Sequence, residues 1–249
     1  MSNKSSAGKK GPITKREAVR EKRRQEQKRK RIFIILAAVA AALIIAALLI
    51  YPSFRPVGEI ITITPIERPM ADGRALGDPN APVKIEIYED FQCPACKNFS
   101  EQIEPQIVDT YVATGEVYYV FRHFPFLDDQ AVRKESDQTA NASMCAADEN
   151  RFWDFHDILF ANWNGENQGA FSDNRLVAFA ESIGLNMESF NQCFDANTHK
   201  DVIDADLQSG KDLGVTGTPS VFVNGKLLTP GLVPSFSEIS DAVQAQLNQ

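Results

Sequence analysis

The chain has 249 residues and a net charge of −7, a length that suits one sizeable domain with an appendage. Its charge is unevenly distributed. Residues 1–51 hold 13 Lys or Arg and 3 Asp or Glu, a balance of +10, while the remainder holds 13 basic and 30 acidic residues, a balance of −17. Because the basic tail directly precedes an apolar run, we expect it to set membrane topology and contact anionic lipid, and not to bind nucleic acid.

Residues 32–51 contain no charged and no strongly polar side chain. As a helix, such a run would rise about 30 Å, the thickness of a bilayer's hydrocarbon core. A cleaved signal peptide is the alternative, but the run exceeds the usual ~7–15 residues, and residues 51–54 offer no small-x-small cleavage site. Basic residues favour the cytoplasmic side, so we predict a cytoplasmic tail (1–31), a single transmembrane helix (32–51) and an extracytoplasmic domain at the cell membrane.

Residues 52–75 are predicted to be an extracytoplasmic linker. Six prolines between positions 52 and 82, together with the polar run 71–74, disfavour a packed core in this stretch. The folded domain is therefore expected to begin near Leu76 and to extend to residue 249. Disulfides persist outside the cytoplasm, so the cysteines of this domain can be oxidised.

The apolar pattern predicts a strand–helix–strand unit at the start of the domain. Residues 83–88 alternate as in a strand, and residues 98–112 carry a helical stripe that Pro105 is expected to bend. Residues 117–121 form the second predicted strand. A unit of this length implies parallel pairing with a right-handed crossover.

From about residue 128 to residue 213 the pattern is helical, with an aromatic stripe that is typical of a core. His156 lies on this stripe and is predicted to be a core histidine, not a metal ligand; His123 and His199 have no partner that the sequence identifies. After the helical block, Asn224-Gly225 predicts a tight hairpin turn. Ser235 followed by Glu238 predicts a capping box at the start of the last helix.

Cys93 and Cys96 are separated by two residues at the predicted strand-to-helix turn. Such a pair can close a small disulfide ring and open it again. The free N–H groups and the positive dipole end of the helix would stabilise a thiolate at Cys93. Pro94 fits the first helical position, where its missing N–H would have had no partner, so Pro94 and Ala95 are predicted to tune the pair. The position and the spacing together predict a redox site.

The predicted order, β-α-β, a helical block and then β-β-α, resembles the thioredoxin superfamily. More narrowly, it resembles the membrane-anchored bacterial branch of the DsbA-like thiol:disulfide oxidoreductases. The motifs that carry the resemblance are Cys-Pro-Ala-Cys at 93–96, Gly-Thr-Pro-Ser at 217–220, and the stretches 76–83, 89–96, 121–125 and 152–156. The resemblance covers residues 76–249 and implies an α/β thioredoxin fold with a helical insertion at about 128–213, preceded by one transmembrane helix.

The resemblance also implies site residues. Cys93 matches the exposed nucleophile and Cys96 its buried, resolving partner, while Pro219 matches a cis proline that faces the pair, with Thr218 beside it. The chain departs from the family in one respect. Many thioredoxin-fold enzymes carry an acidic residue six positions before the first cysteine, where Ile87 stands here. Glu86 turns to the other face of the strand and Glu89 is closer to the loop, so the sequence names no proton acceptor for Cys96.

By this resemblance, the protein introduces disulfides into reduced or misfolded exported proteins without a cofactor, and a quinone-linked membrane protein recycles it. The alternatives are a tethered reductase or isomerase for dedicated clients and a copper-handling module of the same fold, which usually has wider cysteine spacing and a nearby histidine ligand. Haem attachment needs a histidine where Lys97 stands, and a zinc ribbon needs a second close cysteine pair. No metal is predicted.

Cys145 and Cys193 both fall in the predicted helical block. In an oxidising compartment, a structural disulfide between them is the favoured interpretation, with a contribution of about 2–4 kcal/mol to stability. Two free thiols are one alternative. A relay pair that exchanges with Cys93–Cys96 is the other.

Overall fold

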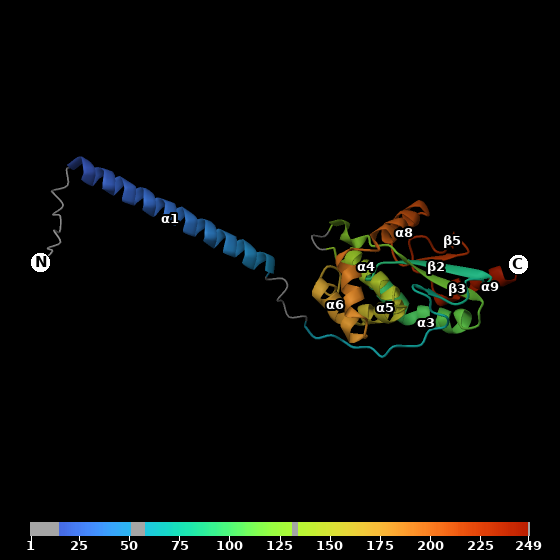
Figure 1. The fold of residues 1–249 in the computed structure, drawn as a ribbon. Coiled ribbons are helices and arrows are strands. Elements are labelled where there is room, and N and C mark those ends of the chain that lie inside the picture. Colours follow the sequence, from blue (N-terminus) through green and yellow to red (C-terminus); the bar gives the residue numbers. More distant parts are fainter. Residues whose placement is uncertain (1–14, 51–57, 131–133, 249) are drawn as a thin grey trace, which may run out of the picture. The chain divides into compact units, whose positions relative to one another are not determined.

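The computed structural model describes residues 15–50, 58–130 and 134–248 (Figure 1), with side chains described at position 20 and over 23–46, 58–128 and 134–248. The described chain divides into two units, the helix α1 (Lys15–Ile50) and the residues from 58 onward. In the described part of the chain, no helix is both long and apolar enough to cross a membrane. Residues 47–51, the end of the predicted span, and residues 1–14 of the predicted tail lie outside the described side chains, so the transmembrane helix stays a prediction.

Among the described residues, five strands form one mixed sheet in the order β1-β3-β2-β4-β5. The strands are β1 (Ala75–Leu76), β2 (Val83–Glu89), β3 (Val117–His123), β4 (Ser220–Val223) and β5 (Lys226–Leu227). The pair β2 and β3 is parallel, with Glu89 opposite His123, and the other pairs are antiparallel. The predicted parallel unit and hairpin are confirmed, whereas the two-residue edge strand β1 was not predicted.

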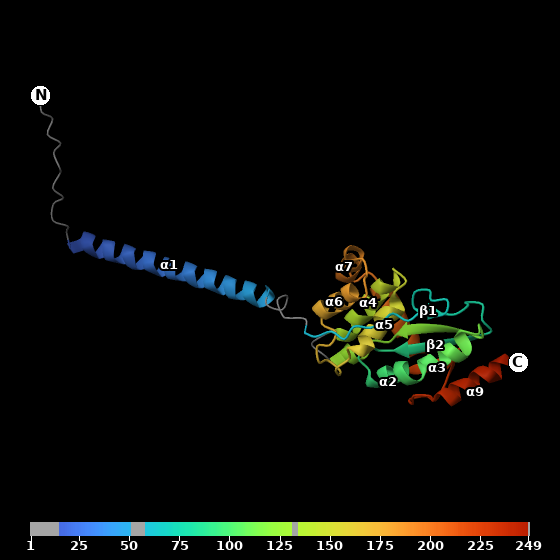
Figure 2. The ribbon, with the colours of Figure 1, turned by 90° about the horizontal axis from the view of Figure 1, so that it is seen from below.

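The central strand β2 is buried on both faces. Val83, Ile85 and Ile87 are fully buried and face the main core, which includes Cys96 of the cysteine pair. Tyr88 faces a smaller cluster on the other side of the sheet, with Phe124 and Phe222. Figure 2 shows α2 (Pro94–Gln102), α3 (Glu104–Ile107) and α9 (Phe236–Leu247) along one side of the sheet, where they cover the main core.

The helix after the cysteine pair is divided at the predicted bend. The helix α2 (Pro94–Gln102) stops at Ile103, and α3 (Glu104–Ile107) begins with Pro105 in its first turn. A π-helical turn over Val108–Val112 completes the segment. The division follows from Pro105, because a proline has no N–H with which to continue the hydrogen-bond ladder of α2.

The predicted helical block lies between β3 and β4, after a 3-10 turn at Leu127–Gln130. Its helices are α4 (Glu135–Ala147), α5 (Phe152–Ala161), α6 (Asp173–Ser182), α7 (Met187–Asp195) and α8 (Lys200–Asp212). Asn224 and Gly225 have φ of 45° and 78°, as a type I′ turn requires. The capping box of Ser235 and Glu238 at the start of α9 is also confirmed.

The described part of the predicted linker lies against the domain. Ile60 and Ile63 pack on the main core, and the Ile61 N–H donates to Asn162 Oδ1 at 2.9 Å. Arg68 binds two carboxylates of the domain. The folded unit therefore begins before Leu76, because a proline-rich segment without regular structure can still pack its apolar side chains along a surface.

Candidate active site

The turn from β2 into α2 places Cys93 at the start of a helix. Cys93 is the N-cap residue of α2, in an extended conformation, and Pro94 occupies the first turn. The Cys93 N–H donates to the carbonyl of Asp90 at 2.9 Å, and its own carbonyl accepts the first helical bond from Lys97 at 3.1 Å. The sulfur of Cys93 therefore lies beside the free N–H groups of the helix start.

Buried hydrogen bonds tie this turn to the helical insertion. The Asp90 carboxylate accepts from the Gln92 N–H at 2.9 Å and from the Ser136 hydroxyl at 2.7 Å. The Gln92 side chain in turn donates to the Ser136 hydroxyl at 2.8 Å and accepts from the Asn167 N–H at 2.6 Å. Because α4 supplies Ser136, the insertion holds the redox turn in place.

The structure brings Cys93, Cys96, Thr218 and Pro219 together. Both thiols are free, and the Thr218–Pro219 peptide bond is cis. The Cys93 Sγ atom lies 3.3 Å from the Thr218 carbonyl oxygen. Cys96 is fully buried. Cys93 was predicted to be exposed, but only 7% of its surface is, because Thr218 lies against its sulfur.

The two thiols have opposite tendencies to ionise. A hydrogen bond from the Cys96 thiol is the main cause that lowers the pKa of Cys93 to about 6, and the N–H groups of Cys96 and Ala95 add to it against the effect of burial. Burial raises the pKa of Cys96 well above its usual value. The Thr218 hydroxyl is buried without a hydrogen-bond partner among the described residues, so it is free to donate to a thiolate, and it lowers the pKa of both thiols. Cys93 is therefore a thiolate at neutral pH, and Cys96 is a thiol.

Glu89 is a component of the site that the sequence analysis did not assign. It is the last residue of β2 and only 1% exposed, and neither carboxylate oxygen has a hydrogen-bond partner in the described chain. Burial raises its pKa well above the usual value, and its charge raises the pKa of Cys96. The sequence did contain a signal for Glu89. Ile87 stands where many enzymes of this fold carry an acidic residue, and Glu89 follows it by two residues, so both side chains lie on the same face of the strand.

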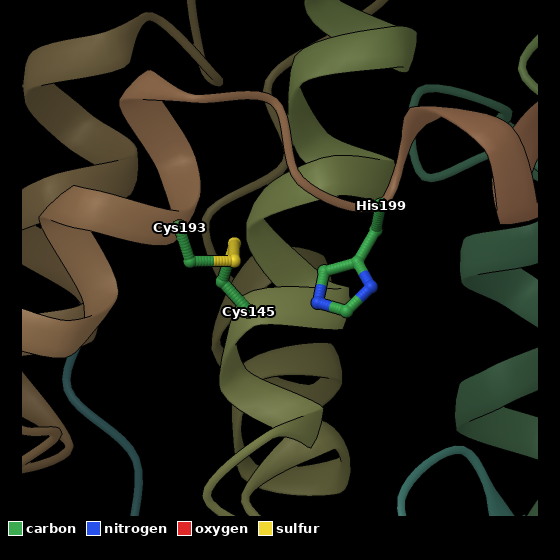
Figure 3. A group of neighbouring side chains, drawn as sticks. All are labelled: Cys145, Cys193 and His199. Atoms are coloured by element: carbon green, nitrogen blue, oxygen red, sulfur yellow. A yellow bond between two sulfur atoms is a disulfide. The ribbon is translucent and has the colours of Figure 1, made fainter.

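Cys145 and Cys193 form a disulfide that joins α4 to α7, with Cα atoms 5.8 Å apart. Figure 3 shows the imidazole of His199 beside this disulfide, and ligand atoms of the three residues lie within 4.8 Å of one another. The sulfurs are bonded to each other and so do not act as thiolate ligands. His199 Nε2 pairs with Asp148 Oδ2 at 2.9 Å.

The other assigned groups of the sequence analysis lie away from the sulfurs. His156 is buried in the aromatic core, as predicted, and its Nδ1 bonds Asp157 Oδ1 at 2.8 Å. Lys97 pairs with Glu101 on the surface of α2. Glu86 pairs with Arg122 at 2.6 Å on the opposite face of β2 from Glu89, so it is not available to Cys96.

Residues 70–244 match the family model described as thioredoxin, and the chain belongs to that family. Its sequence is 28% identical over 180 residues to a probable disulfide bond formation protein D of Bacillus cereus, across 71% of this chain and 79% of that protein. Its fold is similar to oxidised BdbD of Bacillus subtilis, with a TM-score of 0.64 and 24% identity over 77% of this chain and 100% of that one. It is also similar to α-DsbA1 of Wolbachia pipientis, with a TM-score of 0.59 and 24% identity over 73% and 94% of the two chains. With paired cysteines at the start of α2, the protein is a DsbA-like thiol:disulfide oxidoreductase.

Proposed function

We propose that the protein introduces disulfides into reduced exported proteins, acting outside the cytoplasm from a membrane anchor at residues 32–51. The observation that carries this direction is the lowered pKa of Cys93, about 6, at the start of α2. A stabilised Cys93 thiolate favours the reduced enzyme, which makes the oxidised enzyme a disulfide donor. The name of the Bacillus cereus relative, a probable disulfide bond formation protein, agrees with this direction.

The reaction begins with the oxidised Cys93–Cys96 pair. A thiolate of the client attacks the sulfur of Cys93, so that a mixed disulfide forms and Cys96 leaves as a thiolate. A second client thiolate attacks the client sulfur of the mixed disulfide, which closes the client disulfide and releases Cys93 as a thiolate. Two electrons pass from the client to the cysteine pair.

Cys96 needs a proton as it leaves, because burial raises the pKa of this thiol. We assign Glu89 as the proton donor. Its carboxyl group is buried on the core face of β2, and its raised pKa favours the protonated form. A buried carboxyl group that holds its proton more tightly than an exposed one is suited to donate that proton to a leaving thiolate. When the pair is oxidised again, the Glu89 carboxylate accepts the proton back.

The anchor and the partners belong to the same proposal. The apolar run 32–51 and the basic residues before it support a single span with the N-terminus in the cytoplasm, where the tail contacts anionic lipid. A membrane redox partner, by analogy a quinone-linked protein, accepts the two electrons and restores the disulfide. Cys145–Cys193 is a structural crosslink of the insertion, without a part in the exchange.

The test is the reduction potential of the Cys93–Cys96 pair in the full-length chain, equilibrated with glutathione buffers. We expect a value well above that of reducing thioredoxins, between about −180 and −120 mV, the range of oxidising enzymes of this fold. Oxidation of a reduced, unfolded client with two cysteines should accompany it. A value near about −270 mV, typical of a reducing thioredoxin, would reverse the proposed direction and favour a tethered reductase.

A further inference from the structure

The N-terminal segment, residues 58–75, lies along the helix α5 and runs in the opposite direction. Near its start, Ile61 pairs with Asn162, directly after the C-terminal end of α5. Near its end, the carbonyl of Ala71 accepts a hydrogen bond from Asn150 Nδ2 at 3.2 Å, just before α5 begins. The segment that follows the predicted anchor is therefore docked at both ends of one helix of the insertion.

Asn162 holds the start of this segment by its backbone. The Ile61 N–H donates to Asn162 Oδ1 at 2.9 Å, and Asn162 Nδ2 donates to the Ile61 carbonyl at 2.8 Å. The same Nδ2 group donates to the carbonyl of Ile158 at 2.9 Å, within the last turn of α5. Ile60 and Ile63 pack on the main core. A side-chain amide that binds both backbone groups of one residue acts as a neighbouring strand would, so the segment and the end of α5 are fixed to each other.

Trp163 directly follows Asn162 and reaches the redox turn. Its Nε1–H group donates to the carbonyl of Gln92 at 2.7 Å. Gln92 is fully buried and directly precedes Cys93. Further along the same loop, the Asn167 N–H donates to Gln92 Oε1 at 2.6 Å. Two consecutive residues of one loop thus contact the N-terminal segment and the residue next to the reactive sulfur.

The peptide group between Gln92 and Cys93 is held at both of its polar atoms. Its carbonyl oxygen accepts from Trp163, and its N–H donates to the carbonyl of Asp90 at 2.9 Å. Because a peptide group is planar, these two bonds hold its orientation. That orientation directs the sulfur of Cys93, the N-cap residue of α2, towards the free N–H groups of the helix start. Without the indole N–H, this peptide group is held at one end only.

We propose that Trp163 is a positioning residue for Cys93, and that the docked N-terminal segment acts on the cysteine pair through Asn162 and Trp163. Each step is a direct contact: backbone to amide at Ile61, the peptide bond between residues 162 and 163, and indole to carbonyl at Gln92. The position of the sulfur matters for thiol–disulfide exchange in either direction. The inference therefore goes beyond the proposed function and does not depend on which way the electrons flow.

The test measures the Cys93 thiolate in the reduced, full-length chain, through its absorbance near 240 nm as a function of pH. The W163F variant keeps an aromatic ring and removes the N–H donor. Because the sulfur then meets the N–H groups of the helix less consistently, we expect the pKa of Cys93 to rise by about 0.4 to 1.5 pH units, the range of coupling through a packed network. N162A should shift the titration in the same direction, and N162A/W163F should shift it no further than W163F alone.

The chain offers a matched control for each variant, at the other end of α5. Trp153 Nε1 donates to the carbonyl of Ala75 at 3.3 Å, so W153F removes an equivalent indole bond from the same helix. N150A frees the far end of the N-terminal segment. Both controls cost stability in the same part of the fold, and neither should move the Cys93 titration.

Two results would overturn the inference. A W163F titration that coincides with that of W153F, or that moves to lower pH, would remove the role of Trp163. An N162A titration that coincides with that of N150A would remove the role of the N-terminal segment. Circular dichroism identifies a variant that does not fold; if W163F is one, N162A decides, because it leaves the indole in place. Failure of the proposed function is distinguishable, because it would show in the reduction potential of the wild-type chain.

Discussion

The Thr218 carbonyl oxygen lies 3.3 Å from the Cys93 sulfur, while the hydroxyl of the same residue lowers the pKa of that sulfur. One residue thus offers two groups of opposite character. The carbonyl can only accept a hydrogen bond and so favours the thiol, whereas the hydroxyl can donate and so favours the thiolate. The identity of residue 218 therefore adjusts the balance between the two forms of Cys93.

Replacement of Thr218 by valine keeps the carbonyl and removes the hydroxyl. We expect the pKa of Cys93, about 6 in the wild type, to rise by about 0.7 units in T218V, the equivalent of one ordinary hydrogen bond of about 1 kcal/mol. Thiolate absorbance near 240 nm, followed as a function of pH, measures it. T216V is the matched control, because Thr216 is an exposed residue of the same loop, and its titration should coincide with the wild type.

The low pKa of Cys93 also predicts how stability depends on pH. The folded pKa of Cys93, about 6, lies below the value of 9.0 for an unperturbed thiol, so the reduced protein gains stability as the pH rises from 6 towards 9 and loses that gain as the pH falls through 6. At pH 7 the Cys93 thiolate should add about 1.4 kcal/mol to the free energy of unfolding of the reduced protein. Urea unfolding at pH 6, 7 and 8 measures it, with the Cys93–Cys96 disulfide form as the control in which neither thiol titrates. Parallel stability curves for the two forms would contradict this reading.

Removal of the Glu89 carboxyl group should slow the exchange itself. In E89Q, we expect a small dithiol to reduce the Cys93–Cys96 disulfide about 100-fold more slowly at neutral pH, the lower range for loss of a general acid. Stopped-flow fluorescence can follow the reaction, because Trp163 Nε1 donates to the carbonyl of Gln92, next to Cys93, at 2.7 Å. E86Q alters a carboxylate on the other face of the same strand and should react at the wild-type rate. An E89Q rate equal to that of E86Q would exclude the proton transfer.

Local pattern predicted most of the framework of the domain. The alternation of Val83, Ile85 and Ile87 identified β2, because these fully buried side chains alternate with the half-buried polar residues Lys84 and Glu86, and that period is visible in the sequence. Asn224-Gly225 predicted the hairpin turn, because these residue types tolerate the positive φ values that a type I′ turn requires and that both residues adopt. Strand β1 was missed because two residues carry no period, and their place at the sheet edge depends on pairing with the distant β3.

The candidate site shows the same division between local and long-range information. The cysteine pair and the start of its helix can be predicted from residues that are neighbours in the chain. The ion pairs of Arg68 with Glu104 and Asp157, in contrast, join three separate segments. Arg68 lies in a proline-rich stretch that the pattern assigned to a linker, and nothing in its neighbours indicates a buried partner. The role of Glu89 depends on burial without a hydrogen-bond partner, which only the packed core reveals.

The Cys145–Cys193 disulfide should affect stability without affecting the redox chemistry. It joins α4 to α7 within the insertion, and its loss in C145A/C193A should lower the free energy of unfolding by about 2–4 kcal/mol in the chain-entropy account. Urea unfolding of the oxidised chain measures the loss. The reduction potential of Cys93–Cys96 should stay at its wild-type value, because the contacts of that pair come from α2 and the Thr218 turn. A changed potential in the double variant would contradict this separation and would show that the crosslink acts on the pair through α4, whose Ser136 holds the redox turn.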